Sequence, residues 1–129
     1  MTYPFEREAD TGLIIISIEI DSKYDLKIVL DTGATNTTID SNALYLLGYD
    51  LRDNIGTVEI ETANGIIDTE VFEVKSLSSL GITKQDFQIQ IYDFLAHGIF
   101  SDYNGLLGLD FLAETNFCIN TRENTITIS

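Results

Sequence analysis

The stretch Leu30-Asp31-Thr32-Gly33-Ala34-Thr35 is the most informative part of this 129-residue sequence. An apolar run from Leu26, broken only by Lys27, leads into it and predicts a strand that belongs to the core. A glycine after the acidic residue allows a backbone conformation that a Cβ would forbid, and the hydroxyl of Thr32 can brace a turn. The sequence therefore predicts a tight turn that holds the carboxylate of Asp31 at the rim of a β structure.

A second segment makes the interpretation of this stretch more specific: Gly105-Leu106-Leu107-Gly108-Leu109-Asp110-Phe111-Leu112. Asp31-Thr32-Gly33-Ala34 resembles the active-site loop of the retropepsin-like aspartic peptidases. The second segment is similar to the two hydrophobic residues and glycine that pack behind that loop in the family. A triplet of Asp, Ser or Thr, and Gly alone occurs by chance in about one chain in twenty of this length. The two segments together, in the family's order, are more specific, and the resemblance runs from about residue 13 to residue 128.

The resemblance implies an all-β fold, a small closed barrel of retropepsin (acid protease) type with a flap hairpin and one or two short helices. The periodicity of the chain agrees, because many short apolar or alternating segments with little helix indicate a β barrel. Residues 76–80 are expected to form a turn and residues 109–114 a helical turn. We expect strands at residues 13–20, 24–30, 57–62, 66–74, 87–92, 117–119 and 125–128, and a short helix at 43–47.

Asn64-Gly65 predicts a two-residue hairpin turn, because a type I′ turn needs positive φ at both of its central residues. In the family, a hairpin at this place is the flap that closes over bound peptide. The resemblance implies that Asn64, Gly65 and Ile66, together with Ala34, contact the backbone of the bound peptide substrate. Leu106 and Leu107 would line side-chain pockets, together with parts of the loop 94–103. An ordinary hairpin without a gating role remains the alternative.

The activity implied by the resemblance is that of an aspartic endopeptidase, with Asp31 as the catalytic residue. Such an enzyme needs two carboxylates that share one proton, since two like charges so close together do not both ionise. This chain has one Asp-Thr-Gly loop, and we interpret Asp110 as a structural support. The second carboxylate is therefore expected from Asp31 of another copy, in a two-fold homodimer. Thr32, by the same resemblance, would hydrogen-bond across the axis and support the loop with Gly33 and Ala34.

Composition limits the partners of the chain. With 21 acidic and 7 basic residues the formal net charge is −14, so we expect no nucleic acid and no anionic membrane to bind through a basic face. The apolar run at residues 13–16 is far too short to span a membrane. The expected partners are a peptide or protein substrate and a second copy of the chain.

No cofactor or metal is expected. A calcium loop that starts at Asp31 would have Asn36 in place of glycine at position six and Asn42 in place of glutamate at position twelve. One Cys and one His offer no zinc spacing. The single Cys118 excludes an internal disulfide, which fits a reducing, cytoplasmic location. Its place between two apolar residues predicts a buried thiol.

The length predicts a single retropepsin-like domain over residues 1–129, with residues 1–12 as an N-terminal arm or an edge strand. Two other functions stay open, because a fold does not fix a function. One is a non-catalytic, dimeric module of retropepsin fold that binds peptides or directs assembly. The other is an acidic scaffold protein in which the Asp31 loop is only a turn.

Overall fold

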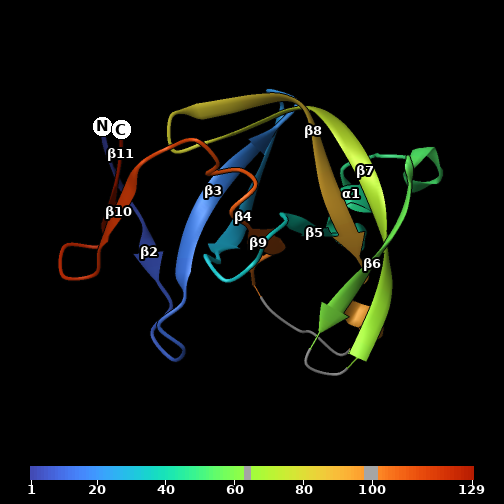
Figure 1. Cartoon of the computed structure of the whole chain (residues 1–129), viewed down its shortest axis with the longest axis horizontal. Coiled ribbons are helices and arrows are strands. Elements are labelled where there is room, and N and C mark those ends of the chain that lie inside the picture. The colour runs from blue at the N-terminus through green and yellow to red at the C-terminus, as the bar shows by residue number, and fades with distance from the viewer. Residues whose placement is uncertain (63–64, 98–101) are drawn as a thin grey trace.

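The structure is a computed structural model that describes residues 1–62, 65–97 and 102–129. It is an all-β fold with one short α-helix, as the sequence predicted (Figure 1). The elements in chain order are β1 (Thr2–Pro4), β2 (Glu6–Arg7), β3 (Ile14–Ile20), β4 (Tyr24–Leu30), β5 (Thr38–Asp40), α1 (Ser41–Leu46), the 3₁₀ turn η1 (Leu51–Asp53), β6 (Gly56–Thr62), β7 (Gly65–Ser79), β8 (Ile82–Tyr92), the 3₁₀ turn η2 (Leu95–His97), β9 (Gly105–Leu107), β10 (Phe117–Asn120) and β11 (Thr125–Ile128).

The hairpin of β3 and β4 confirms the prediction for this part of the chain. Its register runs from Ile15 opposite Val29 to Ile20 opposite Tyr24. Alternate isoleucines of β3 face the core, and Ile18 and Ile20 are at most 1% exposed. Side chains two residues apart share one face of a strand, so this periodicity fixes which side of the hairpin is buried. The hairpin thereby delivers the end of β4 to a defined place in the fold.

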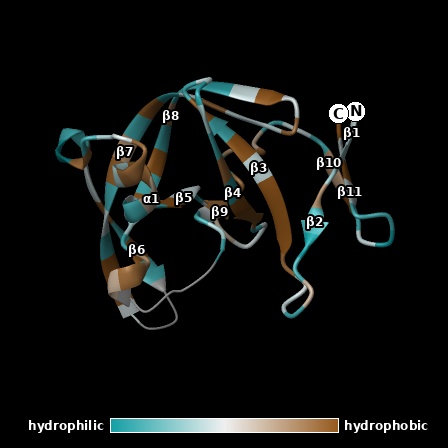
Figure 2. Cartoon of the chain, turned by 180° about the vertical axis from the view of Figure 1, so that it is seen from behind, coloured by the Kyte–Doolittle hydropathy of each residue, from teal (hydrophilic) through white to brown (hydrophobic). Residues whose placement is uncertain are grey.

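Eight strands form the main sheet in the order β2-β3-β4-β9-β5-β8-β7-β6. A further antiparallel pairing of β3 with β7, Ile20 opposite Leu77, closes the sheet on itself. Figure 2 shows the hydrophobic residues gathered along β3 and within the closed part of the sheet. The largest fully buried side chain is that of Phe111, which packs inside this barrel.

A separate three-stranded sheet, in the order β1-β11-β10, brings the two chain ends together. The N-terminal amino group of Met1 donates to the carbonyl of Ile128 at 3.0 Å, and the two ends lie side by side in Figure 1. β1 is an edge strand of this sheet and β2 is an edge strand of the main sheet, while Phe5 between them is buried. Of the two expectations for residues 1–12, the edge strand therefore describes residues 2–7.

Helix α1 begins two residues before the predicted start at residue 43, and Asp40 is its N-cap. The side chain of Asp40 accepts a hydrogen bond from the Asn42 amide, which satisfies one of the free amides of the first turn. After the helix the chain turns at Gly48 with φ of 98°, a conformation that glycine adopts without strain. Among the residues that the structure describes, no helix has the length and apolar character needed to cross a membrane.

Residues 109–114 form consecutive turns, with amide-to-carbonyl bonds from Phe111 to Gly108 and from Thr115 to Leu112, and they do not extend into a helix. Two local expectations were wrong. Residues 76–79 continue β7, because Ser76 and Ser79 are buried and Ser79 Oγ donates to the Ser17 carbonyl at 2.7 Å. The chain turns afterwards, at Leu80 and Gly81. Cys118 is exposed because β10 lies at the edge of the small sheet and alternate side chains of this strand point outward.

Candidate functional site

Asp31 lies directly after β4, on a loop held by its own backbone. The Asp31 amide donates to the Leu107 carbonyl at 3.0 Å, and the Asp31 carbonyl accepts from the Ala34 amide at 3.1 Å. The two residues before it, Val29 and Leu30, are buried and anchor the loop in the core. Asp31 itself is half-exposed and Thr32 is exposed. The structure thus presents a carboxylate rigidly at the surface of the barrel.

Gly33 is needed here for a reason that differs from the expected one. Its φ is not positive, so an unusual backbone conformation does not explain it. A Cβ at this position would lie 3.2 Å from Asp31 Oδ1, and the Gly33 amide donates to that oxygen at 2.9 Å. A glycine therefore lets the loop backbone approach the carboxylate closely enough to hydrogen-bond it. This bond orients one oxygen of Asp31 and leaves the other available.

Asp110 supports the loop from behind, which agrees with its interpretation as a structural residue. Its Oδ2 accepts from the Thr37 amide at 3.0 Å, and its Oδ1 accepts from Thr37 Oγ1 at 2.7 Å and from the Phe111 amide at 2.8 Å. Both carboxylate oxygens are thus bonded within the chain. Asp110 is therefore not placed to act as the second carboxylate of Asp31.

Gly108 brings the two motifs into direct contact. A Cβ on Gly108 would lie 2.7 Å from the Asn36 carbonyl carbon and 2.9 Å from the Ala34 carbonyl oxygen, which is closer than real Cβ contacts. The next residue, Leu109, donates its amide to that Ala34 oxygen at 2.8 Å. The glycine that the sequence analysis placed behind the loop is thus required by a backbone-to-backbone approach.

Strands β6 and β7 form a hairpin at one edge of the main sheet (Figure 1). Gly65 already pairs with Thr62 and has φ of 114°, so it is the first residue of β7 instead of a central turn residue. Ile66 is 69% exposed, which is unusual for a large apolar side chain and fits a contact surface. Asn64 lies outside the described residues.

Leu106 and Leu107 have opposite orientations in β9. Leu106 is half-buried and lies across from Val29, two residues before Asp31. Leu107 is fully buried in the core, so its side chain does not fit the expected contact with a substrate. The reason is the alternation of side chains along a strand, which allows only one of two consecutive residues on each face. Leu107 contributes its carbonyl, which holds Asp31.

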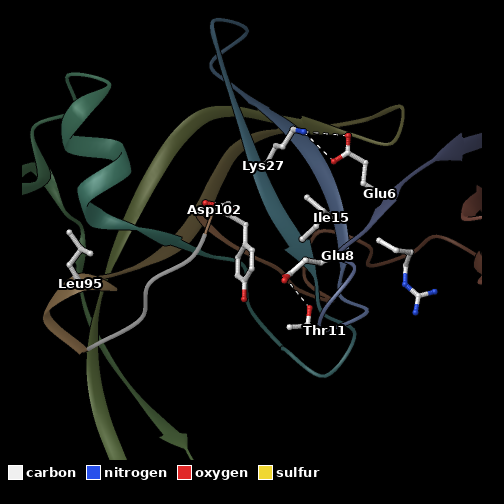
Figure 3. Close-up of a pocket in the computed structure, with 9 residues that line it drawn as sticks. Glu6, Glu8, Thr11, Ile15, Lys27, Leu95 and Asp102 are labelled. Carbon is white, nitrogen blue, oxygen red and sulfur yellow. Dashed lines mark hydrogen bonds and ion pairs between the residues drawn. The ribbon is translucent and has the colours of Figure 1, made fainter.

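A pocket of about 760 Å³ lies beside β4, between β2, β3 and the segment that leads to β9 (Figure 3). Leu95, Asp102 and Tyr103 line it, which places parts of the predicted loop 94–103 at a pocket. Lys27 Nζ reaches Glu6 Oε2 at 3.2 Å across one side. Both side chains are more than half exposed, so this ion pair contributes little to stability.

A second, smaller cavity of about 250 Å³ adjoins the segment after Asp31. Asn36 and the buried Gln90 line it, and neither residue was predicted to belong to the site. Gln90 follows the alternation of β8 as a polar residue, a pattern that normally indicates an outward position. β8 lies inside the sheet, between β5 and β7, and there Gln90 is buried although Gln88 on the same face is exposed. Only the strand order could have identified Gln90 as a residue of the site, and the sequence pattern does not contain that order.

Within the described ranges, no group of three or more His, Cys, Asp or Glu side chains is arranged to hold a metal ion. The chemical groups at the site are therefore the Asp31 carboxylate, backbone amides and the amides of neighbouring side chains. The fold and this site define a class: a retropepsin-like barrel with one carboxylate on a braced Asp-Thr-Gly loop.

Comparison with known proteins agrees with this class. The family model described as aspartyl protease matches residues 16–111, and the chain belongs to that family. A crystal structure of a retropepsin-like aspartic protease from Rickettsia conorii superposes with a TM-score of 0.68 at 19% sequence identity. The match covers 99% of this chain and 89% of that chain, and at this identity it establishes the fold. The search of curated proteins returned no match.

Proposed function

We propose that the protein is an aspartic endopeptidase that hydrolyses peptide bonds with a dyad of two Asp31 residues, one from each subunit of a homodimer. The observation that carries this proposal is the presentation of Asp31 on a loop braced by Gly33, Leu107 and Ala34. Membership of the aspartyl protease family supports the reaction class. The binding of Asp110 to Thr37 within the chain supports the need for a second subunit.

In the proposed mechanism the two carboxylates share one proton. The ionised carboxylate accepts a proton from a water molecule as the water attacks the scissile carbonyl carbon. The protonated carboxylate donates a hydrogen bond to the carbonyl oxygen and stabilises the charge that develops there. The carboxyl group that took the proton from water then gives it to the amide nitrogen, the C–N bond breaks, and the acid and amine products leave with the dyad again holding one proton. Each step needs the carboxylates in fixed positions, which the bond from the Gly33 amide provides for one oxygen.

The residues around Asp31 have proposed roles in binding. The exposed Thr32 would hydrogen-bond to the loop of the partner copy, and Ala34 would face the peptide backbone. The hairpin with Asn64, Gly65 and the exposed Ile66 would act as a flap over the substrate. Leu106, on the same face of the sheet as Val29, would line a side-chain pocket.

The test is cleavage of an unbiased peptide library by the purified protein, by its Asp31→Asn variant and by a matched Asp25→Asn control. Asp25 is an exposed residue of the same strand β4, so its replacement makes the same change of charge away from the loop. We expect Asp31→Asn to lower kcat/KM by at least about 100-fold, the usual range for loss of a general acid or base, with the fold unchanged. Asp25→Asn should retain activity.

A mixing experiment tests the dyad itself. Excess Asp31→Asn subunits added to the parent protein would form mixed dimers with a single ionisable Asp31, and activity should fall as these dimers replace the parent dimers. The Asp25→Asn protein, mixed in the same ratio, should leave activity unchanged. If the parent activity does not respond to Asp31→Asn subunits, each chain acts alone and the dyad is wrong. Asp31-dependent peptide capture without cleavage would favour the non-catalytic binding module.

A further inference from the structure

The small cavity beside the catalytic loop has the size of a subsite for a single side chain. Its volume is about 250 Å³, below the range of about 300–1,000 Å³ that is typical of pockets for whole small molecules. One wall comes from the loop after Asp31, and the others come from the hairpin and from β8. The residues that line it are Asn36, Val58, Glu59, Ile60, Val71, Gln88, Ile89 and Gln90.

Strand register connects this cavity to the catalytic loop. Leu106 of β9 pairs with Thr38 of β5, Thr38 pairs with Gln90 of β8, and Gln90 pairs with Val71 of β7. Directly paired residues share one face of a sheet, so these four side chains form a row across four strands. Leu106 also lies opposite Val29, two residues before Asp31. The row therefore lies on the face of the sheet that leads to the catalytic carboxylate.

Gln90 is a buried polar residue without a partner. It is 8% exposed, and within the part of the chain that the structure describes its carboxamide makes no hydrogen bond. Its backbone amide is occupied by the Thr37 carbonyl at 2.9 Å, so the strand holds it in place. Among the described residues only Thr69 Oγ1 is fully buried without a hydrogen-bond partner, so the carboxamide of Gln90 reaches the open space of the cavity, where a bound group can hydrogen-bond to it.

A second buried polar group lies nearby on the hairpin. Thr69 is 3% exposed, and its Oγ1 has no hydrogen-bond partner among the residues that the structure describes. It pairs with Val58 and precedes Val71 by two residues, so it shares the face of both cavity residues. Glu59 also borders the cavity, but alternation along β6 directs its side chain to the opposite face, that of Asp68. The side chains on the cavity face are thus uncharged amides, a hydroxyl and aliphatic groups.

We propose that this cavity is a specificity subsite that takes a carboxamide side chain of the substrate, Gln or Asn. The inference rests on the proposed peptidase function and adds a substrate preference to it. A carboxamide donates and accepts hydrogen bonds, as the side chain of Gln90 requires, while Val58, Ile60 and Val71 contact its aliphatic part. An aliphatic side chain in the same place would leave Gln90 buried and unpaired, and sites of this kind reject such analogues strongly.

The experiment is a peptide library read out in two ways: cleavage by the active protein and binding to the Asp31→Asn variant. We expect Gln or Asn to be preferred over Leu by tenfold or more. Since a two-fold dimer carries two copies of the cavity, the preference should occur at two positions related across the scissile bond. Gln90→Leu should abolish the preference, and Gln90→Glu should move it to Lys or Arg at the same positions.

Two further variants separate the subsite from effects on folding. Gln85→Leu is the matched control, an exposed glutamine of the same strand outside the cavity, and it should leave the preference unchanged. Asn36→Ala changes an exposed residue at the cavity wall, so the fold tolerates it, and it should weaken the Gln preference several-fold.

The outcomes distinguish the subsite from the peptidase. If no peptide is cleaved, but the Asp31→Asn protein enriches Gln or Asn at one position through Gln90, the subsite stands and the peptidase is wrong. If peptides are cleaved and Gln90→Leu leaves every positional preference unchanged, the subsite is wrong and the peptidase stands. A parent preference for Lys or Arg at these positions would also overturn the proposal, and would assign recognition to Glu59.

Discussion

Thr37 and Asp110, 73 residues apart in the chain, are joined by two hydrogen bonds that connect the Asp31 loop to the segment behind it. The Thr37 hydroxyl also accepts from the Gly108 amide at 3.1 Å, so one fully buried side chain links both motifs. The carboxylate of Asp110 accepts both of these bonds and a third from the Phe111 amide. The geometry of Asp31 therefore depends on a contact that forms only when distant parts of the chain have folded together.

We predict that Asp110→Ala destabilises the fold by about 2–3 kcal/mol, because it leaves the buried Thr37 amide and hydroxyl without acceptors. Asp110→Asn keeps one acceptor oxygen and should cost about half as much. Urea unfolding measures both changes. The exposed Asp25→Ala serves as the control and should change stability by less than about 0.5 kcal/mol. A cost for Asp110→Ala within that margin would contradict the support role.

A double-mutant cycle of Thr37→Val with Asp110→Ala tests whether the two residues act as a unit. Because they share hydrogen bonds, the double variant should be more stable than the sum of the single effects implies, with a coupling of about 1 kcal/mol or more. Thr37→Val alone also removes the acceptor of the Gly108 amide. Strictly additive effects would mean that each residue stabilises the fold through other contacts.

We predict different effects for alanine at the two glycines of the site. Gly108→Ala places a Cβ against the backbone of Asn36 and Ala34, which can move only by shifting the catalytic loop, so it should cost about 1–3 kcal/mol and most of the activity. Gly33→Ala meets only Asp31 Oδ1, at 3.2 Å. It should lower kcat with little change in unfolding free energy. Equal stability losses for both variants would contradict this distinction.

Much of the site could be predicted from the sequence, because the features that define it are local. The strand that ends in Asp31, the glycine beside it and the motif at residues 105–112 are each encoded in a few consecutive residues. The structure confirms the strand, and it places the two motifs in backbone contact. The role of Gly33 was predicted for the wrong reason. A glycine required by close approach to a carboxylate oxygen looks the same in the sequence as a glycine required by a positive φ.

Other features depend on strand order and could not be predicted from local patterns. Ser76, Ser78 and Ser79 suggested a turn, but they belong to β7, which pairs with both β8 and β3 in this region. Cys118 lies between two apolar residues, a pattern typical of a buried strand, but it faces outward because β10 is an edge. In each case the neighbours of the strand decide which side chains are covered, and those neighbours are distant in the sequence.

We predict that stability at alkaline pH depends on Tyr49. Burial raises the pKa of Tyr49, and so does its hydrogen bond to Asp21, in which the phenol donates to Oδ2 at 2.6 Å. Because the folded pKa lies above the unfolded value of about 10, the stabilisation is fully present below pH 10 and is lost as pH rises from there toward the folded pKa. Tyr49→Phe should cost about 1 kcal/mol at pH 7 and progressively less above pH 10.

Urea unfolding at pH 7 and pH 11 measures this difference. Tyr45→Phe is the matched control, because Tyr45 is 72% exposed on helix α1. Its effect should be small and should not change between the two pH values. The pH-dependence would be contradicted by a cost of Tyr49→Phe that stays constant or grows at pH 11.

The dimer that we propose should become tighter as salt is added. Each copy carries a formal charge of −14, so association brings two strongly negative bodies together and long-range repulsion opposes it. Salt shortens the reach of this repulsion, from a Debye length of about 30 Å at about 10 mM to about 8 Å at about 150 mM. Sedimentation of the Asp31→Asn protein, which avoids self-cleavage, measures the dissociation constant at both concentrations. Glu73→Lys, an exposed change on β7, lowers the charge of each copy and should reduce the salt dependence. A dimer that weakens with added salt would instead indicate that ion pairs across the interface dominate its stability.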